Sequence, residues 1–331
     1  MLTRKDNLLF LLLGLMLVVL SAVHLTSGQI DLECKDYVDA IFRPNHSNTD
    51  HLIILEFRIP RLTLAIIAGA GLAVAGMLMQ TLFNNPLAGP YVLGLSSGSS
   101  LFVAIFLMSG LTFFSGQFGI ILAALTGATL FGYLILQLSF FVRSHLSLLL
   151  IGLMIGSFTG AIISILQFTT GAQQLKAFTM WTMGSLQYAE LDQLPLIIIP
   201  FVAACIFTFF LTRRLNALVL GERQAESLGI NMKDTRIAVI TAAVLFTGLI
   251  TAYCGPIAFV GLAVPNMTRI LFRTQNHFKL ILANLLVGAI FLILCDTVIL
   301  ILEPIITIPI NAFTSLLGAP MIIFLVLKRL K

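Results

Sequence analysis

Apolar stretches of membrane-spanning length recur along almost the whole chain, and this repetition constrains the fold more than any other feature. A helix needs about 20 apolar residues to cross the hydrocarbon core of a bilayer. The stretches are residues 8–27, 62–82, 91–110, 117–141, 146–168, 194–211, 236–254, 257–272, 279–299 and 308–327. The sequence therefore predicts an all-α polytopic membrane protein with about ten transmembrane helices.

The third and eighth stretches are the least regular. They are interrupted by Gly94, Gly98, Pro256, Gly261 and Pro265. Glycine and proline break or kink helices, and irregular backbone at membrane depth is tolerated where it is buried in protein or lines a wet cavity. We therefore expect these two stretches to form partial or bent helices.

Composition excludes a soluble domain, because 59% of the 331 residues are hydrophobic, only 10% are charged and the mean hydropathy is +1.05. Residues 8–27 follow Arg4 and Lys5, as in a signal peptide. The apolar run is longer than a typical signal-peptide core and further spans follow it, so a retained first helix is expected. The excess of basic residues is no evidence for nucleic acid, and no nucleic-acid partner is expected.

The placement of the 19 Lys and Arg residues predicts the orientation. With the N-terminus in the cytoplasm, fourteen of them lie inside and five lie outside; the five are Lys35, Arg43, Arg58, Arg61 and Lys176. Cytoplasmic loops of membrane proteins carry the excess of basic residues. Both termini are thus expected inside, as an even number of spans requires, and residues 1–331 are expected to form a single membrane domain.

Segment 217–231, between the sixth and seventh spans, is patterned like a helix but is too charged for lipid. Every fourth residue is glycine or alanine, which would place small side chains on one helical face beside apolar ones. Such a face suits a docking helix for a separate protein; the alternative is an amphipathic loop helix that packs on its own bundle. The residues of interest are Leu220, Gly221, Glu222, Ala225, Leu228 and Gly229.

Two arginines stand at the outer start of the second span, after an outer loop at residues 28–57. Arg58 and Arg61 flank Pro60, which is favoured in the first turn of a helix. The guanidinium fork suits a carboxylate. One interpretation is that the pair receives acidic residues of an extracytoplasmic delivery protein; the other is that it anchors the helix at the headgroups or pairs with Glu56.

A set of small and polar residues within the spans suggests a transport pathway. Such residues belong where helices approach closely, where they bond across helices, or where backbone lines a wet cavity. Their weak polarity would suit a bulky cargo whose metal is already coordinated. The candidates are Ser96, Ser97, Gly98, Gly156, Ser157, Gly160, Ser164, Asn311 and Ser315.

The motifs of common enzymes and metal sites are not found. There is no phosphate-binding loop, no HExxH or GxSxG motif, and the four cysteines stand singly. Asp296 is the only acid deep in the second half of the chain, which is too little for a proton relay. No catalytic residues and no bound metal are expected, so the energy source must belong to another chain.

In combination, six ordered stretches resemble the permease subunits of type II ABC importers, which take up ferric siderophores, haem and vitamin B12. The resemblance extends over nearly the whole chain. The stretches are Arg58-Ile59-Pro60-Arg61, residues 76–98 with Asn85-Pro86-Leu87-Ala88, Trp181-Thr182-Met183-Gly184-Ser185, residues 215–229, residues 255–265 and Leu317-Gly318-Ala319-Pro320.

The resemblance implies a permease of the bacterial inner membrane that is not itself an enzyme. It implies a second copy of this chain or a related one, with the pathway between the two, and two ATPase subunits that bind ATP and magnesium. A substrate-binding protein would dock on Arg58 and Arg61, and the ATPases on segment 217–231. The expected function is ATP-driven import of a metal chelate, with a ferric siderophore preferred and haem or vitamin B12 as alternatives.

Two positions depart from the family pattern. Asn266 stands where family members often have histidine, and Leu300 stands where many have an arginine that contributes to binding-protein docking. That third docking contact is therefore in question. The alternative from another class is a stand-alone secondary transporter, which should show inverted repeats and several buried ionisable groups; neither is evident in the sequence.

Overall fold

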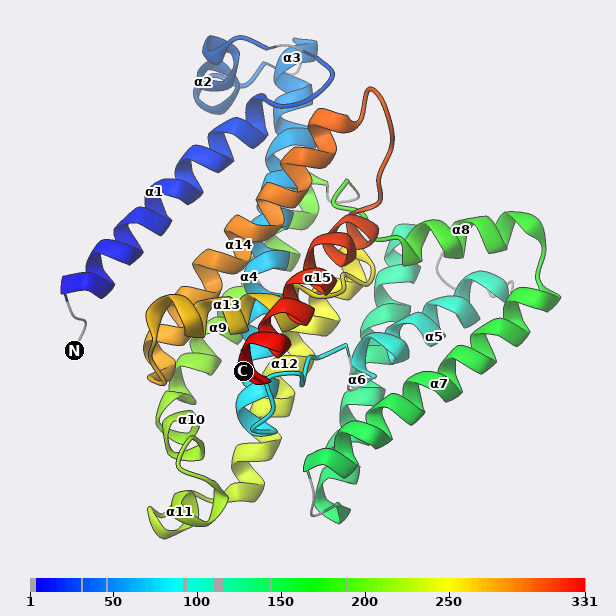
Figure 1. The fold of residues 1–331 in the computed structure, drawn as a ribbon. Helices are drawn as coiled ribbons and strands as arrows, with labels where there is room; N and C mark the ends of the chain where they lie inside the picture. The colour runs from blue at the N-terminus through cyan, green and yellow to red at the C-terminus, as the bar shows by residue number, and fades with distance from the viewer. Residues whose placement is uncertain are drawn as a thin grey trace.

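The computed structural model describes residues 4–30, 32–45, 47–91, 94–109, 116–142, 145–187 and 190–330 (Figure 1). Within these ranges every regular element is a helix. The predicted all-α fold is therefore confirmed.

Each of the ten predicted spans contains a helix in the described part of the chain. Among the described residues, seven segments are long and apolar enough to cross a membrane unaided. They are α1 (Arg4–Thr26), the run Thr49–Leu82 that ends with α4 (Ile59–Leu82), α6 (Gln117–Phe141), α7 (His145–Thr169), α9 (Leu194–Phe210), α12 (Met232–Cys254) and α14 (His277–Leu302).

The other three spans are α5 (Leu95–Met108), α13 (Val260–Phe272) and α15 (Ile310–Leu330). With 14 and 13 residues, α5 and α13 are too short to cross the hydrocarbon core alone. They are the third and eighth spans, which were expected to be partial or bent. Gly94 and Pro256 precede the two helices, whereas Gly98, Gly261 and Pro265 lie within them.

Helix α4 forms the centre of the bundle, and glycines let its neighbours approach closely. A Cβ atom on Gly69 would lie 2.1 Å from the carbonyl oxygen of Gly288 in α14. A Cβ atom on Gly76 would lie 1.6 Å from the carbonyl oxygen of Gly261 in α13. Membrane helices pack through such small residues because lipid provides no hydrophobic drive for their association.

The link between α12 and α13 is irregular backbone packed inside the protein. Gly255 has φ +70° and Phe259, at the N-terminus of α13, has φ +66°. Unsatisfied backbone groups are costly away from water. The Ala258 N–H donates to the side-chain oxygen of Asn311 at 3.0 Å. Asn311 lies at the start of α15.

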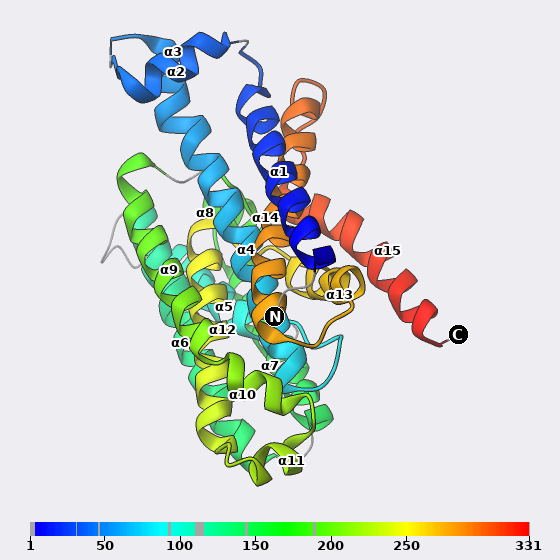
Figure 2. The same cartoon turned by 90° about the vertical axis from the view of Figure 1, so that its left-hand side faces the viewer.

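The two ends of the bundle carry short helices; following the predicted orientation, the end with residues 34–42 is named the outer end and the opposite one the inner end. At one end lie α2 (Cys34–Phe42), α3 (Thr49–Leu52) and the π-helical turn η1 (Ile53–Arg58), while α8 (Ala172–Thr182) follows α7. At the opposite end lie α10 (Thr212–Leu218) and α11 (Glu222–Ser227) (Figures 1 and 2). The outer segment expected to be a loop is thus partly helical, and the second span extends back from Pro60 to Thr49 without a break.

Candidate functional site

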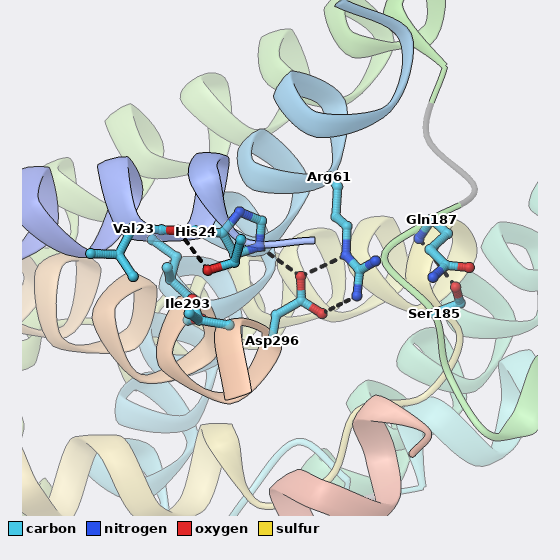
Figure 3. A network of polar contacts seen from close by, with 9 residues as sticks. Val23, His24, Arg61, Ser185, Gln187, Ile293 and Asp296 are labelled. Carbon is cyan, nitrogen blue, oxygen red and sulfur yellow. Dashed lines mark hydrogen bonds and ion pairs between the residues drawn. The ribbon is translucent and has the colours of Figure 1, made fainter. Parts of the chain in front are cut away.

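Asp296 is buried near the outer end of α14 and binds two side chains from other helices (Figure 3). Arg61 of α4 donates from Nε to Oδ2 and from Nη2 to Oδ1, both at 2.8 Å. His24 of α1 has its Nε2 2.8 Å from Oδ2, so we assign the imidazole proton to this nitrogen. Three helices therefore meet at one carboxylate.

The Arg61–Asp296 pair is protected from water, with 12% and 2% of the two side chains exposed. Removing one member of a buried ion pair costs about 3–5 kcal/mol, because it leaves a buried charge without its partner. A new exposed pair contributes only about 0.2–1 kcal/mol. A carboxylate on another protein would therefore not draw Arg61 away from Asp296.

Arg58 has a different environment one helical turn earlier. Its Nη1 donates to the Leu25 carbonyl oxygen at 2.6 Å and to the Tyr37 hydroxyl, and its Nη2 donates to the Ile30 carbonyl oxygen. Its Cζ atom also lies 5.8 Å from the centroid of the Tyr37 ring. Among the described residues, Arg58 thus ties the outer segment to the start of α4 through neutral groups.

Two cavities flank Arg61 at this outer end. They measure about 370 Å³ and 380 Å³, and both are lined by Arg61, Gln187 and Glu303. The larger one is also lined by Arg58 and Leu300. Leu300 therefore places an apolar side chain in the wall where the resemblance led us to expect a further arginine.

A third cavity, inside the bundle, brings together part of the predicted pathway. It measures about 290 Å³ and is lined by Ser96, Asn311 and Ser315, among others. The buried hydroxyl of Thr247 in its wall has no hydrogen-bond partner among the described residues. None of the described lining residues is Asp, Glu, Lys, Arg or His, so the cavity is weakly polar and uncharged.

Gly98 is engaged in packing between helices. A Cβ atom on it would lie 2.4 Å from Cγ of Phe131 in α6. Ser97, the residue before Gly98 in α5, instead faces α7. Its Oγ lies 3.4 Å from the position that a Cβ atom on Gly156 would take. The two residues therefore serve contacts with different helices.

The remaining pathway candidates lie on an open face of α7. Ser157 and Ser164 are exposed, and their hydroxyls donate to carbonyl oxygens of α7 itself. A Cβ atom on Gly160 would meet no described atom within 4 Å. This part of the face has no close neighbour among the described residues.

The inner segment is not the continuous helix that its spacing suggested. Helix α11 covers only Glu222–Ser227, with Gly221 at its N-cap and Gly229 beyond its end. These glycines have φ +99° and +81°, values that favour glycine over other residues. The small residues therefore do not form one helical face, because the glycines are needed to turn the chain at both ends.

Ala225 is also not part of an outward face. It is fully buried in the apolar core of the inner end, whereas Leu220 and Leu228 are 58% and 59% exposed. The exposed apolar surface of the segment is thus carried by the two leucines, and Ala225 packs the segment onto its own bundle.

Glu222 joins the segment to α12. It accepts a hydrogen bond from Nη2 of Arg236 at 2.8 Å, and Nη1 of the same arginine donates to the Ser139 carbonyl oxygen of α6 at 2.9 Å. The Glu222 and Arg236 side chains are 34% and 19% exposed. This pair is therefore more accessible to solvent than the one at Asp296.

A polar network connects four helices beside the inner segment. Arg269 of α13 donates to Gln80 at 2.9 Å and to Thr81 at 3.2 Å, both in α4. Thr81 lies 2.9 Å from Nε2 of His277, whose backbone N–H donates to Asn216 of α10 at 2.8 Å. One chain of hydrogen bonds therefore links α10, α14, α4 and α13.

Comparison with known proteins identifies the family, since residues 15–328 match the FecCD transport family. The chain belongs to the FecCD transport family. A hemin transport system permease of Yersinia pestis is 33% identical, over 96% of each chain. An iron(3+)-hydroxamate import permease of Bacillus subtilis is 31% identical, over 98% of each.

A solved structure supports the same assignment. It is described as an inward-facing conformation of a metal-chelate type ABC transporter, and it matches with a TM-score of 0.85 at 30% identity, over 97% of this chain and 99% of that one. The FecCD chain is therefore a multi-pass permease subunit of an ABC importer in the cytoplasmic membrane, and its ATPase is a separate subunit. ABC importers of this family work with ATPase and binding-protein partners.

Sequence reasoning missed the His24 contact in this FecCD permease. His24 follows Asp6 by 18 residues, which is five helical turns, so both lie on the face of α1 toward α14. Asp6 accepts from Lys279 at 2.6 Å at the other end of α14. Two ionisable residues on one face of an apolar span could have indicated that this face contacts charged groups of another helix.

Proposed function

We propose that this chain passes a metal chelate, with a ferric siderophore as the preferred cargo, from a binding protein into the cytoplasm. ATP hydrolysis on partner chains drives the change between outward-facing and inward-facing states. Residues 1–331 form one membrane domain with both termini in the cytoplasm. The observation that carries the proposal is the exposed Leu220 and Leu228 pair on the inner segment of a FecCD permease.

The inner segment is the proposed ATPase contact. Leu220, Gly221, Glu222, Leu228 and Gly229 lie at or next to α11. The two leucines supply apolar area, and the glycines hold the short helix in position. Ala225 contributes from below by packing the helix on its own bundle. Each of two ATPases, with ATP and magnesium, would bind one permease in this way.

A second permease copy is the proposed neighbour of α7. The open face around Gly160 also carries Phe168, whose exposed fraction is 93%. Small residues permit close helix approach and aromatic residues supply contact area. The transport path would then run between two copies, past Ser157, Ser164 and the uncharged interior cavity with Ser96, Asn311 and Ser315.

The cargo is proposed from the uncharged cavity together with the relatives. A chelate carries its own metal ligands, so its path needs no carboxylate or histidine cluster. Similar permeases belong to hemin, iron chelatin and iron(3+)-hydroxamate transport systems. Haem and vitamin B12 are the alternative cargoes. A molybdate permease of Haemophilus influenzae is 31% identical, but a free oxyanion would require donors or cations that the described cavity lining does not concentrate.

The decisive experiment measures uptake into proteoliposomes. The permease is reconstituted with and without its ATPase and binding protein, and ferric hydroxamate, ferric catecholate, haem, cobalamin and molybdate compete for uptake. We expect ATP-dependent uptake only with all components, and competition by a ferric siderophore. Uptake by the permease alone would support a secondary transporter and overturn the proposal.

The docking assignment has its own variant, L220D/L228D, which places two charges on the exposed apolar pair. We expect ATPase co-purification to fall at least about tenfold, since an interface core excludes charge, while thermal stability stays unchanged because both side chains are exposed. Ser227→Ala, on the same segment, is the matched control and should co-purify as the parent does. Undiminished co-purification of the double variant would place the ATPase contact elsewhere.

A further inference from the structure

Two of the cavities described above meet at the start of α15. The outer cavity is the one of about 370 Å³ beside Arg61, and the interior cavity is the one of about 290 Å³ beside Ser96. Among the described residues, none lines both of them. Ile310 lines the outer cavity, and the next residue, Asn311, lines the interior one. The start of α15 therefore forms part of the wall between the two cavities.

Asn311 joins this wall to two other segments through hydrogen bonds. Its Nδ2 donates to the Thr182 carbonyl oxygen at 3.3 Å, and its backbone N–H donates to the Met183 carbonyl oxygen at 3.2 Å. Its Oδ1 accepts from the Ala258 N–H at 3.0 Å. One residue thus connects the start of α15, the end of α8 and the link between α12 and α13, which lie side by side in Figure 1.

The three segments are in direct backbone contact at this wall. A Cβ atom on Gly184 would lie 3.1 Å from Cγ2 of Ile310 and 3.2 Å from the carbonyl oxygen of Pro256. A Cβ atom on Gly255 would lie 2.4 Å from the carbonyl oxygen of Trp181. The two glycines leave no space for a larger side chain, so the wall is closed where the backbones touch.

We propose that Asn311 is a positioning residue of an outer gate, whose hydrogen bonds keep the wall between the outer and the interior cavity closed. Cargo passes only after the side-chain bonds of Asn311 break. The net contribution of one amide hydrogen bond is modest, so a conformational change can break it. Backbone groups at membrane depth need a partner, and water entering from the outer cavity supplies one to Ala258 and Thr182. The gate deepens the pathway role proposed above and rests on it.

Asn284 provides a contrast within the same bundle. It is a buried asparagine in α14, and its Nδ2 donates to the Leu280 carbonyl oxygen of the same helix at 2.7 Å. Its Oδ1 has no hydrogen-bond partner among the described residues. The described side-chain bond of Asn284 therefore joins no two segments, and its removal should leave the gate closed.

The experiment measures how fast a cysteine in the interior cavity reacts with a charged, membrane-impermeant methanethiosulfonate applied from outside. The reporter is Ser96→Cys in a permease whose native cysteines are replaced by alanine, expressed with its ATPase in spheroplasts. For Asn311→Ala in this background we expect labelling at least about fivefold faster, since loss of two hydrogen bonds shifts the equilibrium toward the open gate. Asn284→Ala is the matched control and should label at the reporter's rate.

Asn311→Asp protects the test from a packing defect, because aspartate has nearly the shape of asparagine. An aspartate carboxylate can accept from the Ala258 N–H but cannot donate to Thr182. Labelling should therefore again be faster than in the reporter. Thermal melting of each purified variant shows whether it is folded, and if Asn311→Ala is not, the result for Asn311→Asp decides.

The outcomes separate the gate from the function beneath it. Folded Asn311 variants that label at the reporter's rate would show that other contacts hold the wall, and would overturn the inference. Equal acceleration by Asn284→Ala would also overturn it, because general loosening of the bundle would then explain the labelling. If the parent with its partner chains imports no chelate, the proposed function fails; if it does, unaccelerated labelling contradicts the gate alone.

Discussion

The cluster around Asp296 at the outer end and the segment around α11 at the inner end handle charge in different ways. At the outer end, His24, Arg61 and Asp296 come from three helices far apart in sequence and meet in a buried cluster. At the inner end, the charges of α11 lie together in one short segment, and the Glu222–Arg236 pair is partly exposed. Burial therefore makes the outer cluster a structural device, whereas the inner segment stays accessible to a partner.

The same contrast applies to the apolar residues. Leu220 and Leu228 are exposed at the inner end, beyond the membrane helices, where lipid would not cover them. At the outer end Leu300 is buried at 8% exposure in the cavity wall. Two exposed leucines at the ends of one short charged segment are consistent with the docking role proposed for this segment.

The largest effect that would test this comparison is expected for Asp296→Ala. Arg61 and His24 would lose their shared carboxylate, and an uncompensated buried charge costs about 3–5 kcal/mol. The apparent Tm of the purified permease should therefore fall steeply. In the matched variant H24L/R61M/D296L the whole cluster becomes apolar, and most of the lost stability should return. A Tm unchanged by Asp296→Ala would show that the outer cluster is not a structural device.

A smaller effect is expected for Ala225→Trp at the inner end. Because Ala225 is fully buried, a larger ring must displace the core beneath α11, and overpacking costs about 1–3 kcal/mol. We expect a lower Tm together with reduced ATPase co-purification. Had Ala225 faced outward, as the spacing suggested, only co-purification would change. Thermal melting of the same preparation distinguishes the two cases.

The smallest effect is expected for Glu222→Gln. The pair with Arg236 is partly exposed, and such pairs contribute about 0.2–1 kcal/mol, which salt reduces further. The change in Tm should be small at low salt and close to zero at about 500 mM NaCl. A loss as large as that of Asp296→Ala, at either salt concentration, would remove the contrast between the two ends.

Local sequence was sufficient for the spans. The predicted limits 117–141 coincide with α6, and 194–211 differ from α9 by one residue. The length of an apolar stretch is a local property of the sequence. In lipid, an isolated span can satisfy its backbone N–H and C=O groups only by forming a helix. Pro256 likewise marks the irregular link before the short α13, whereas Gly261 and Pro265, also predicted to interrupt this span, lie within the helix.

Local sequence was insufficient for the inner segment. The four-residue spacing of Gly221, Ala225 and Gly229 fits a helical face, but the first and last of these residues have positive φ. A glycine in a sequence can serve as a small residue on a helical face or as a residue that adopts positive φ in a turn. The first role predicts one continuous helix here, and the second predicts a short helix with a turn at each end. Only the folded chain decided between them, and it placed Ala225 against the core.

By itself, the sequence determined that this protein is a bundle of membrane helices, with a charged segment at 217–231 and two arginines at the start of its second span. The tertiary structure decided which charges are available to a partner. Asp296 is a single acid when the chain is read in order, yet it compensates Arg61, which lies 235 positions away, whereas the bonds that the described residues give Arg58 go to neutral groups. Electrostatic compensation depends on distance in space and on burial, and neither is written in the local order of residues.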